Sequence, residues 1–357
     1  MNLMDLPYAA INLAPVREEL SSQESPFANV EFTGFKRDLS PAIPVVTYII
    51  PVHNQAAIIK NNLQSILKCS SMLHEFIIID DASTDGSDKQ IAAWISSVSE
   101  NSGLTTCITF IKTESDIFET ACDSIGIQLA AGEFIIEVQS DMTLREHGFD
   151  RLMVNALTTN VDVFAVSGRG IHPISSVVGK QGPRAVLADK IRSATLRATS
   201  MLRSRRAYRP SPILFILCGE AGRLGEDINK PLVQAQGRRL LYVGGSVMRG
   251  PLAFRRDEYE VLEGFDLECF FLGNDDHDLL SRAAGLLKKT GAYLPIAFDS
   301  PTNLGTTRQV RNESKEKRYQ QLKRQFTIAA AKSYLESHGP RMPEPKRSVR
   351  KISTTLL

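Results

Sequence analysis

Residues 45–87 constrain the fold most, because they read as a strand, a helix and a strand in immediate succession. Val45 to Ile50 is a short run rich in β-branched residues that stops at Pro51, which is typical of a strand buried on both faces. Residues 56–68 carry apolar side chains at helical spacing, and Phe76 to Ile79 is a second buried run. This order predicts an α/β domain with a parallel sheet, whose ligand binds at the carboxyl ends of the strands.

Polar side chains follow both predicted strands. The first strand is followed by Pro51, His53 and Asn54, and the second by Asp80, Asp81, Ser83 and Asp85. Ser87 can then cap a further helix. An acidic group of this kind fits either a ligand site or a turn that caps the next helix, so the residues alone leave both interpretations open.

These two turns resemble the opening of the family 2 glycosyltransferases of the GT-A fold. In that family the first strand ends in a Pro-x-aromatic-Asn turn and the second ends in Asp-Asp-x-Ser-x-Asp. The resemblance extends over roughly residues 44 to 300 and implies a Rossmann-like, mostly parallel central sheet flanked by helices. We therefore expect an N-terminal arm (1–43), a GT-A domain (44–312) with a nucleotide-binding half (about 44–145) and an acceptor half (about 146–312), a basic insertion (about 172–212), and a C-terminal helix with a basic tail (313–357).

The bulk composition is that of an ordinary globular protein. Its 357 residues allow one large domain or two modest ones, and 43% of them are hydrophobic. The five cysteines are widely spaced and form no CxxC pair, so the sequence suggests neither a zinc site nor a disulfide framework. The longest apolar run, Ile213 to Cys218, has the size of a strand, and the N-terminus shows no signal-peptide pattern. We expect a cytoplasmic protein, with peripheral contact to the inner face of the membrane as an open alternative.

Further elements complete the first half. A strand is predicted over 105–111, a helix over 118–131 and a strand over 134–138. Where the family usually has Ala-Arg-Asn-x-Gly, residues 122–126 read Cys-Asp-Ser-Ile-Gly, so only Gly126 remains of that element.

Gln139-Ser140-Asp141 stands where the family has its Asp-x-Asp metal motif. The resemblance implies that Mg²⁺ or Mn²⁺ neutralises the diphosphate leaving group, and hard cations of this kind prefer carboxylate oxygens. We expect Asp141 to supply a metal ligand. Gln139 is neutral, and it can hydrogen-bond the ribose or a metal-bound water. The alternative for Asp141 is a helix cap.

A helix over 148–157 and a strand over 162–166 are predicted to begin the acceptor half, and a basic stretch follows them. Between residues 180 and 209 there are nine Lys and Arg residues against the single Asp189, with leucines and isoleucine interleaved. Such a stretch fits an anionic membrane surface or lipid-linked acceptor, a phosphorylated acceptor, or a solvated helix packed on the domain. We expect no nucleic-acid partner, because no recognised nucleic-acid module accompanies the charge.

A second acidic cluster lies at 263–282. It reads Glu-Gly-Phe-Asp at 263–266 and Gly-Asn-Asp-Asp-His-Asp-Leu-Leu-Ser-Arg at 273–282, which resembles the Gly-Gly-Phe-Asp-Glu and Glu-Asp-x-Asp-Leu-x-x-Arg segments of the family. The resemblance implies that Asp276 is the catalytic base, with Asp266 and Asp275 on the acceptor side. We expect neighbouring acids to raise the proton affinity of Asp276, and Arg282 to be structural. The alternative is that the acids only favour a helix N-terminus.

The remaining predictions concern glycines, a loop and the end of the chain. A strand over 240–243 leads into Gly244 and Gly245, which permit close backbone approach to a ligand. An edge strand is predicted over 292–298, followed by a loop whose Arg308 and Arg311 can fold over the donor diphosphate. A helix is predicted over 314–338, and residues 341–351 are expected to be mobile because they are Pro-rich and basic.

The family resemblance implies a glycosyltransferase that moves a sugar with inversion from a nucleotide-diphosphate sugar, UDP-sugar favoured, to a hydroxyl of a saccharide or lipid-linked acceptor. The family resemblance places this in polysaccharide or glycoconjugate biosynthesis. We expect Asp81 to accept a hydrogen bond from the base, while Pro51 and Asn54 shape the pocket. The alternatives are a sugar-1-phosphate nucleotidyltransferase and a non-catalytic nucleotide- or carbohydrate-binding relic of a transferase.

Overall fold

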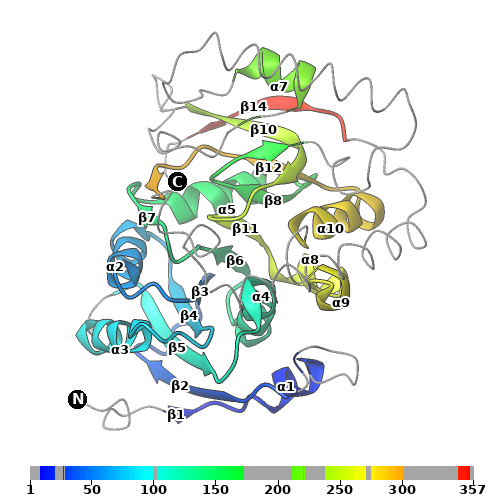
Figure 1. Cartoon of the computed structure of the whole chain (residues 1–357). Helices are drawn as coiled ribbons and strands as arrows, with labels where there is room; N and C mark the ends of the chain where they lie inside the picture. Colours follow the sequence, from blue (N-terminus) through cyan, green and yellow to red (C-terminus); the bar gives the residue numbers. More distant parts are fainter. Residues whose placement is uncertain are drawn as a thin grey trace. The chain divides into compact units, whose positions relative to one another are not determined.

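The computed structural model describes residues 9–20, 27, 29–99, 103–172, 211–219, 221, 238–270, 275–300 and 345–353 (Figure 1). The chain divides into two compact units, which are described separately. Unit 1 comprises Met1–Val154, Ala253–Val261 and Asp299–Val310, and unit 2 comprises Asn155–Leu252, Leu262–Phe298 and Arg311–Leu357.

Unit 1 is a mixed α/β structure built on a mostly parallel sheet. The strand order is β1 (Ala9–Ala10), β2 (Phe32–Asp38), β5 (Thr105–Thr113), β4 (His74–Asp80), β3 (Val46–Val52), β6 (Phe134–Glu137) and β11 (Leu252–Arg255). Strands β3, β4, β5 and β6 are parallel, and β2 is antiparallel to β5. The strands predicted over 45–50, 76–79, 105–111 and 134–138 are confirmed, although β3 continues through Pro51.

Helices cover both faces of this sheet, as the alternation of side chains along β3 requires. Tyr48 and Phe76 lie on one face, where the Phe76 ring meets Trp94 of α3 (Ser87–Ser97) at a centroid distance of 5.1 Å. Ile49 points to the other face, where it lies against Gly126 of α4 (Phe118–Leu129). A β-carbon on Gly126 would come within 2.7 Å of Ile49, so this glycine permits close packing of helix on strand.

Asp150 ties a third helix to the same sheet. It lies near the start of α5 (Phe149–Thr159) and is fully buried. Its carboxylate accepts hydrogen bonds from the Tyr48 hydroxyl at 3.1 Å, the Ser71 backbone N–H at 2.8 Å and the Met72 backbone N–H at 3.0 Å. The acid therefore stabilises the turn after α2 (Ile59–Cys69), because buried donors need partners.

The strands of unit 2 follow in the order β8 (Val163–Ser167), β12 (Thr290–Tyr293), β10 (Arg238–Val247) and β14 (Ser348–Ser353). β8 and β12 are parallel, while β10 is antiparallel to β12, to β14 and to β9 (Ile171–His172). Its helices are α7 (Pro212–Cys218), α9 (Leu267–Phe270), α10 (Asp275–Arg282) and the π-helical turn η3 (Ala283–Leu287). The remaining short elements of the chain are α1 (Ala14–Leu20), β7 (Thr143–Leu144), α8 (Arg256–Val261) and β13 (Phe298–Asp299).

Both ends of the chain contribute strands that the sequence did not predict. In the arm, β2 pairs with β5 over its whole length, from Phe32 opposite Thr113 to Asp38 opposite Cys107. The expectation of mobility was wrong for residues 348–351, because β14 pairs with β10 from Ser348 to Ser353. The charged side chains of these strands do not show the apolar pattern of a strand in the sequence. The backbone nevertheless supplies the hydrogen bonds between strands, whatever the side chains are.

One further prediction of local structure was wrong, and one apolar run takes a form that its length left open. The run Ile213–Cys218 forms helix α7, because Pro212 begins the helix and Gly219 ends it with a left-handed φ of +78°. The edge strand expected over 292–298 ends at Tyr293, and β12 lies between β8 and β10 instead of at an edge. Pro295 falls after the strand, where its missing N–H removes no ladder bond.

Among the described residues, no helix combines the length and the apolar character that crossing a membrane requires. The predicted basic stretch 180–209, Arg308, Arg311 and the predicted helix 314–338 lie outside the described residues.

Candidate functional site

The turns that follow β3 and β4 are joined by hydrogen bonds into one polar surface at the carboxyl edge of the unit 1 sheet. The Asn54 backbone N–H donates to the Ser83 hydroxyl at 2.9 Å, and the Asn54 side-chain oxygen accepts from the Thr84 N–H at 2.9 Å. His53 donates through Nδ1 to the backbone carbonyl of Asp81 at 2.6 Å. Its Nε2 therefore accepts from the Asn54 amide at 2.9 Å, which assigns the tautomer.

Asp85 and Ser87 extend this network toward α3. The Asp85 carboxylate accepts from the Ala56 N–H at 2.9 Å and from the Ser87 hydroxyl at 2.6 Å. The Ser87 hydroxyl in turn accepts from the Gln55 N–H at 2.8 Å. The two turns thus hold each other in place, and Asn54 is kept in a left-handed conformation with a φ of +53°.

Asp81 is buried beneath this surface and holds the start of α4. Its carboxylate accepts from the Ile117 N–H at 2.7 Å and from the Phe118 N–H at 3.0 Å. Burial raises the pKa of Asp81 to about 6, against the opposing effect of these N–H donors and of His53. The Thr113 hydroxyl also lies 3.4 Å from Oδ1. A carboxylate has about four lone-pair positions, so these three contacts leave acceptor capacity for one further donor. The base-recognition role of Asp81 stays a prediction.

Asp80, at the end of β4, is also buried. Its Oδ1 accepts from the Ser83 N–H at 3.3 Å, while its Oδ2 has no hydrogen-bond partner among the described residues. Burial is the largest cause that raises the pKa of this carboxyl. The pair Asp80 and Asp81 is therefore less acidic than two exposed aspartates.

Gln139 and Asp141 lie on the same edge of the sheet, because they follow β6, which is parallel to β3. Gln139 donates through its amide to the Glu119 carboxylate at 2.9 Å, and Asp141 is buried and accepts from the Ser300 hydroxyl at 3.5 Å. Asn62 of α2, which sequence reasoning missed, fixes this turn by donating to the carbonyls of residues 139 and 142 at 3.0 and 2.7 Å.

An acidic cluster that sequence reasoning also missed lies beside Gln139. Glu119 and Asp123 of α4 and Glu137 of β6 bring one carboxylate oxygen each within 4.8 Å of one another. Asp123 occupies the position where the family resemblance has an arginine. The spacing of Glu119 and Asp123, one helical turn apart, is visible in the sequence, but the approach of Glu137 depends on how α4 packs.

The second predicted cluster lies in unit 2, at the start of α10. Asp275 is buried and forms an ion pair with Arg249, whose guanidinium lies 4.8 Å from the centre of the Phe265 ring. Asp278 forms an ion pair with Arg282 at 2.7 Å. Both of these acids are therefore paired with arginines, and the raised proton affinity expected for Asp276 stays a prediction.

Asp276 differs from Asp275 and Asp278 because it is only half-buried. Its Oδ1 accepts from the backbone N–H of His277 at 2.8 Å. Arg282 donates to the carbonyl of Gly264 at 2.7 Å and to that of Leu262, which joins α10 to the turn that carries the half-buried Asp266. These contacts agree with the structural role predicted for Arg282.

His277 faces another histidine. Its ring centre lies 4.2 Å from that of His172 in β9, and burial lowers the pKa of His277 to about 4. At neutral pH this ring is therefore uncharged, so it adds no positive charge beside Asp276.

Gly244 and Gly245 admit neighbouring protein backbone closely. Gly244 has a φ of +114°, and a β-carbon there would come within 2.8 Å of Arg347. A β-carbon on Gly245 would come within 2.6 Å of the His172 carbonyl oxygen. The close neighbours of both glycines are thus other segments of unit 2, and the predicted approach to a ligand stays a prediction.

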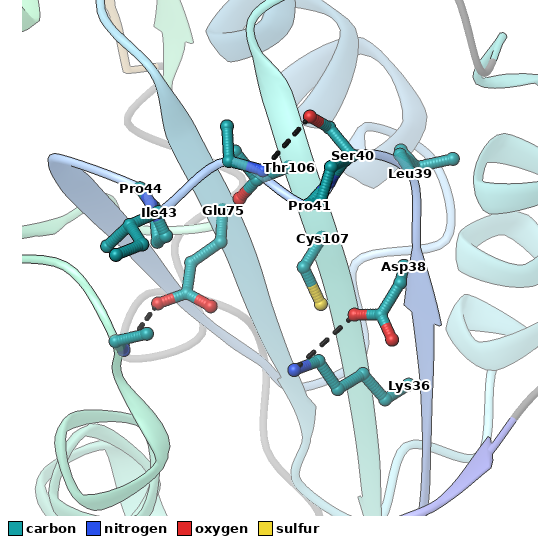
Figure 2. A pocket seen from close by; sticks show the side chains of 12 residues that line it. Lys36, Asp38, Leu39, Ser40, Pro41, Ile43, Pro44, Glu75, Thr106 and Cys107 are labelled. Atoms are coloured by element: carbon teal, nitrogen blue, oxygen red, sulfur yellow. Dashed lines mark hydrogen bonds and ion pairs between the residues drawn. The ribbon is translucent and has the colours of Figure 1, made fainter.

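A separate hollow of about 580 Å³ lies at the opposite, amino-terminal edge of the unit 1 strands (Figure 2). Glu75 borders it and accepts from the Thr47 hydroxyl at 2.6 Å and from the Ala131 N–H at 2.6 Å. Lys36 forms an ion pair with Asp38 at 3.4 Å at the border of the hollow. Burial raises the pKa of the nearby Cys107 thiol to about 12. The hollow lacks every residue of the predicted nucleotide site.

The predicted residues therefore fall into three groups. Unit 1 brings Pro51, His53, Asn54, Asp81, Ser83, Gln139 and Asp141 to one edge of its sheet. Unit 2 carries Gly245, Asp266, Asp275 and Asp276. Arg308 and Arg311 lie outside the described residues.

The sequence matches one family model. Residues 47–204 match the family described as glycosyl transferase family 2, and this segment contains the turns after β3, β4 and β6. The resemblance read from those turns is confirmed over that segment. A search of the curated proteins finds no match to this sequence.

Several solved structures align with this chain at low identity. A mannosyltransferase from Pyrobaculum calidifontis in complex with GDP-Man and Mn²⁺ is 15% identical, with a TM-score of 0.46 and coverage of 85% of this chain and 78% of that chain. A glucosyl-3-phosphoglycerate synthase from Mycobacterium tuberculosis in complex with UDP is 14% identical, with a TM-score of 0.42 and coverage of 81% and 80%. TarS 1–349 from S. aureus is 11% identical, with a TM-score of 0.41 and coverage of 83% and 75%. At these TM-scores the likenesses say nothing about the ligands of this chain.

Proposed function

We propose that this chain, a glycosyltransferase of family 2 by its match over residues 47–204, transfers a sugar from a nucleoside-diphosphate sugar to a hydroxyl group of a saccharide or lipid-linked acceptor. The observation that carries the proposal is the hydrogen-bonded pair of turns after β3 and β4. In parallel sheets, ligands bind at this edge. The turns lie inside the matched segment and present Asn54 and Ser83 together.

The donor would lie on this edge, with its base toward Asp81 and its diphosphate toward the turn after β6. Asp81 is the acceptor proposed for a base N–H, and His53 and Asn54 would shape the pocket as one hydrogen-bonded unit. The Gln139 amide, held by Glu119, is proposed to face the ribose. UDP-sugars are the donors we favour.

A divalent cation, Mg²⁺ or Mn²⁺, is part of the proposal. Asp141 is the predicted ligand, and Glu119, Asp123 and Glu137 offer three carboxylates whose oxygens lie within 4.8 Å of one another. This donor chemistry fits a hard cation, which prefers carboxylate oxygens. When bound, the cation would neutralise charge on the diphosphate leaving group.

Asp276 is proposed as the general base. A sugar hydroxyl is a poor nucleophile, so a carboxylate must take its proton as the new glycosidic bond forms. Asp276 is only half-buried, whereas Asp275 and Asp278 are buried, so its carboxylate is the most accessible of the three. A single displacement would invert the anomeric carbon, and Asp266 and Asp275 would border the acceptor. Gly245, Arg308 and Arg311 remain proposed donor contacts.

Donor hydrolysis and transfer test this proposal. The full chain is incubated with UDP-, GDP- and dTDP-sugars, with and without Mn²⁺, and sugar release is measured together with thermal stabilisation by each nucleoside diphosphate. The account predicts turnover of at least one donor. Asp276→Asn should lose on the order of 10²-fold or more in rate while it keeps the thermal shift, whereas Glu268→Gln, at an exposed acid of α9, should retain activity.

The same experiment distinguishes the alternatives. A nucleotide-binding relic would shift in melting temperature without turning over any donor. A nucleotidyltransferase would release pyrophosphate from a nucleoside triphosphate in the presence of a sugar phosphate. Either result would overturn the proposed transfer reaction.

A further inference from the structure

Helix α7 of unit 2 displays an aliphatic face to solvent. Its sequence is Pro-Ile-Leu-Phe-Ile-Leu-Cys, with no charged residue. Ile213 is 70% exposed, Ile216 50% and Leu217 70%. Seven large hydrophobic side chains are exposed among the described residues, and three of them fall within these five positions. Exposed apolar residues are normal when scattered, but clustering of this kind marks an interaction surface.

The opposite face of α7 is firmly packed, so the exposed face has a fixed direction. Phe215 is fully buried, and its ring meets that of Tyr242 in β10 edge-on at a centroid distance of 5.5 Å. The helix also contacts β14 (Figure 1). Ile213, Ile216 and Leu217 occupy positions i, i+3 and i+4, which share one side of a helix. The aliphatic face is therefore the outer side of an anchored helix.

Basic side chains adjoin this helix. Gly219, at its C-terminal end, lies so close to Arg347 that a β-carbon would come within 2.6 Å of the guanidinium. The segment 345–353 that contains Arg347 also carries the exposed Lys346 and Lys351, and it contains no Asp or Glu. The sequence directly before the helix adds four arginines between residues 203 and 209.

We propose that the outer face of α7 docks onto an anionic lipid bilayer, with Ile213, Ile216 and Leu217 inserted among the acyl chains at the interface. Lys346, Arg347 and Lys351 would meet the acidic headgroups. An apolar helix face bordered by cations is the chemistry that binds such surfaces. The proposal stands on α7 and its basic neighbours, so it does not depend on the transfer reaction.

Two observations favour a bilayer over a protein partner. Three aliphatic side chains are too few for a stable protein interface, which buries about 800 Å² on each partner and is usually anchored by aromatic residues or arginine. A second copy of this chain would bring the same cations, including Lys346 and Lys351, against each other. An anionic membrane complements both the aliphatic face of α7 and the basic side chains beside it.

The size of the effect follows from the exposed side chains. Transferring a largely exposed Ile or Leu into hydrocarbon changes a partition coefficient by roughly tenfold. Each cation near an acidic surface contributes about fivefold at physiological ionic strength. Removing all three aliphatic side chains should therefore weaken vesicle binding by roughly 10²-fold or more.

The test is co-sedimentation of the full chain with vesicles of phosphatidylcholine alone and of phosphatidylcholine with phosphatidylglycerol. We expect binding to the anionic vesicles that weakens with salt. The triple variant Ile213→Ser, Ile216→Ser, Leu217→Ser should lose this binding, and Lys346→Glu with Lys351→Glu should weaken it. The matched control Val161→Ser, at a residue that is 76% exposed in the same unit, should bind as the parent does.

The melting temperature of the triple variant confirms that it folds, since Phe215 is retained. Equal binding by the parent and the triple variant would overturn the proposal, as would absence of binding to anionic vesicles. A parent dimer that the triple variant converts to a monomer, without vesicle binding by either, would also overturn it and identify a second copy as the occupant.

Discussion

The buried carboxyl of Asp81 makes a quantitative prediction about stability and pH. Its pKa is raised from 3.8 to about 6, mainly by burial. A raised pKa means that the folded state favours the protonated acid, so the stabilising contribution is complete below the unfolded pKa and is lost as the pH rises through the folded pKa. A difference of about two units corresponds to about 3 kcal/mol, because each unit is about 1.4 kcal/mol.

The substitution Asp81→Asn isolates this effect. Asparagine is nearly isosteric but does not titrate, and its amide opposes the N–H groups of Ile117 and Phe118, so the variant carries a loss that does not vary with pH. Other titrating groups, Asp80 among them, are common to both proteins. The difference between the two unfolding free energies therefore reports Asp81 together with its electrostatic effect on His53 and Asp116.

The assay is urea unfolding of both proteins over a series of pH values. From the linkage relation, the advantage of the parent over Asp81→Asn should shrink by about 2 kcal/mol between about pH 4.5 and 7.5. It should be level above that range. Two curves that run parallel across the series, or an advantage that grows with pH, would refute the reasoning that burial dominates at Asp81.

Three further predictions concern unit 1. Asp150→Ala should lower the free energy of unfolding by about 3–5 kcal/mol, because several donors lose their acceptor, whereas the exposed Asp257→Ala should change it by less than about 0.5 kcal/mol in the same urea titration. Gly126→Ala should cost about 1–3 kcal/mol, since its β-carbon would lie 2.7 Å from Ile49, and Ile49→Val should recover part of that loss if the clash is the cause. The Cys107 thiol, whose pKa is raised to about 12, should react with a disulfide reagent at neutral pH only as the chain unfolds; rapid labelling of the folded protein would contradict this.

The central strands were predictable because their burial on both faces shows directly in the sequence as consecutive apolar residues. Strands buried on both faces carry short apolar stretches, such as Tyr48–Ile50 in β3 and Phe76–Ile79 in β4. Strands with partly exposed side chains, such as β2, were not predictable in this way. β2 reads Phe-Thr-Gly-Phe-Lys-Arg-Asp, and its identity as a strand depends on pairing with β5, about 70 residues away in sequence.

Helix α7 shows that the length and apolar character of a run do not by themselves identify its secondary structure. The run Ile213–Cys218 is rich in residues suited to strands, but Pro212 before it and Gly219 after it mark the two ends of a helix. The proline and the glycine at its ends therefore indicate the helix, which the composition of the run does not.

The candidate site likewise contains residues that the sequence predicts and contacts that it does not. The turn residues Asn54, Asp81 and Ser83 follow their strands directly, so the sequence alone brings them to one edge. The contacts of the Asp81 carboxylate with Ile117 and the approach of Glu137 to the acids of α4 depend on how α4 packs, which no local pattern contains.

The most direct test of the account is the position of the nucleotide on unit 1. Amide hydrogen exchange of the full chain, with and without UDP and Mn²⁺, compares the two edges of the same sheet. The account predicts that the nucleotide slows exchange in residues 52–56, 81–87 and 139–142, and leaves the border of the amino-edge hollow at residues 36–44 unchanged. Slowed exchange confined to residues 36–44, while the turns after β3 and β4 exchange as before, would contradict it.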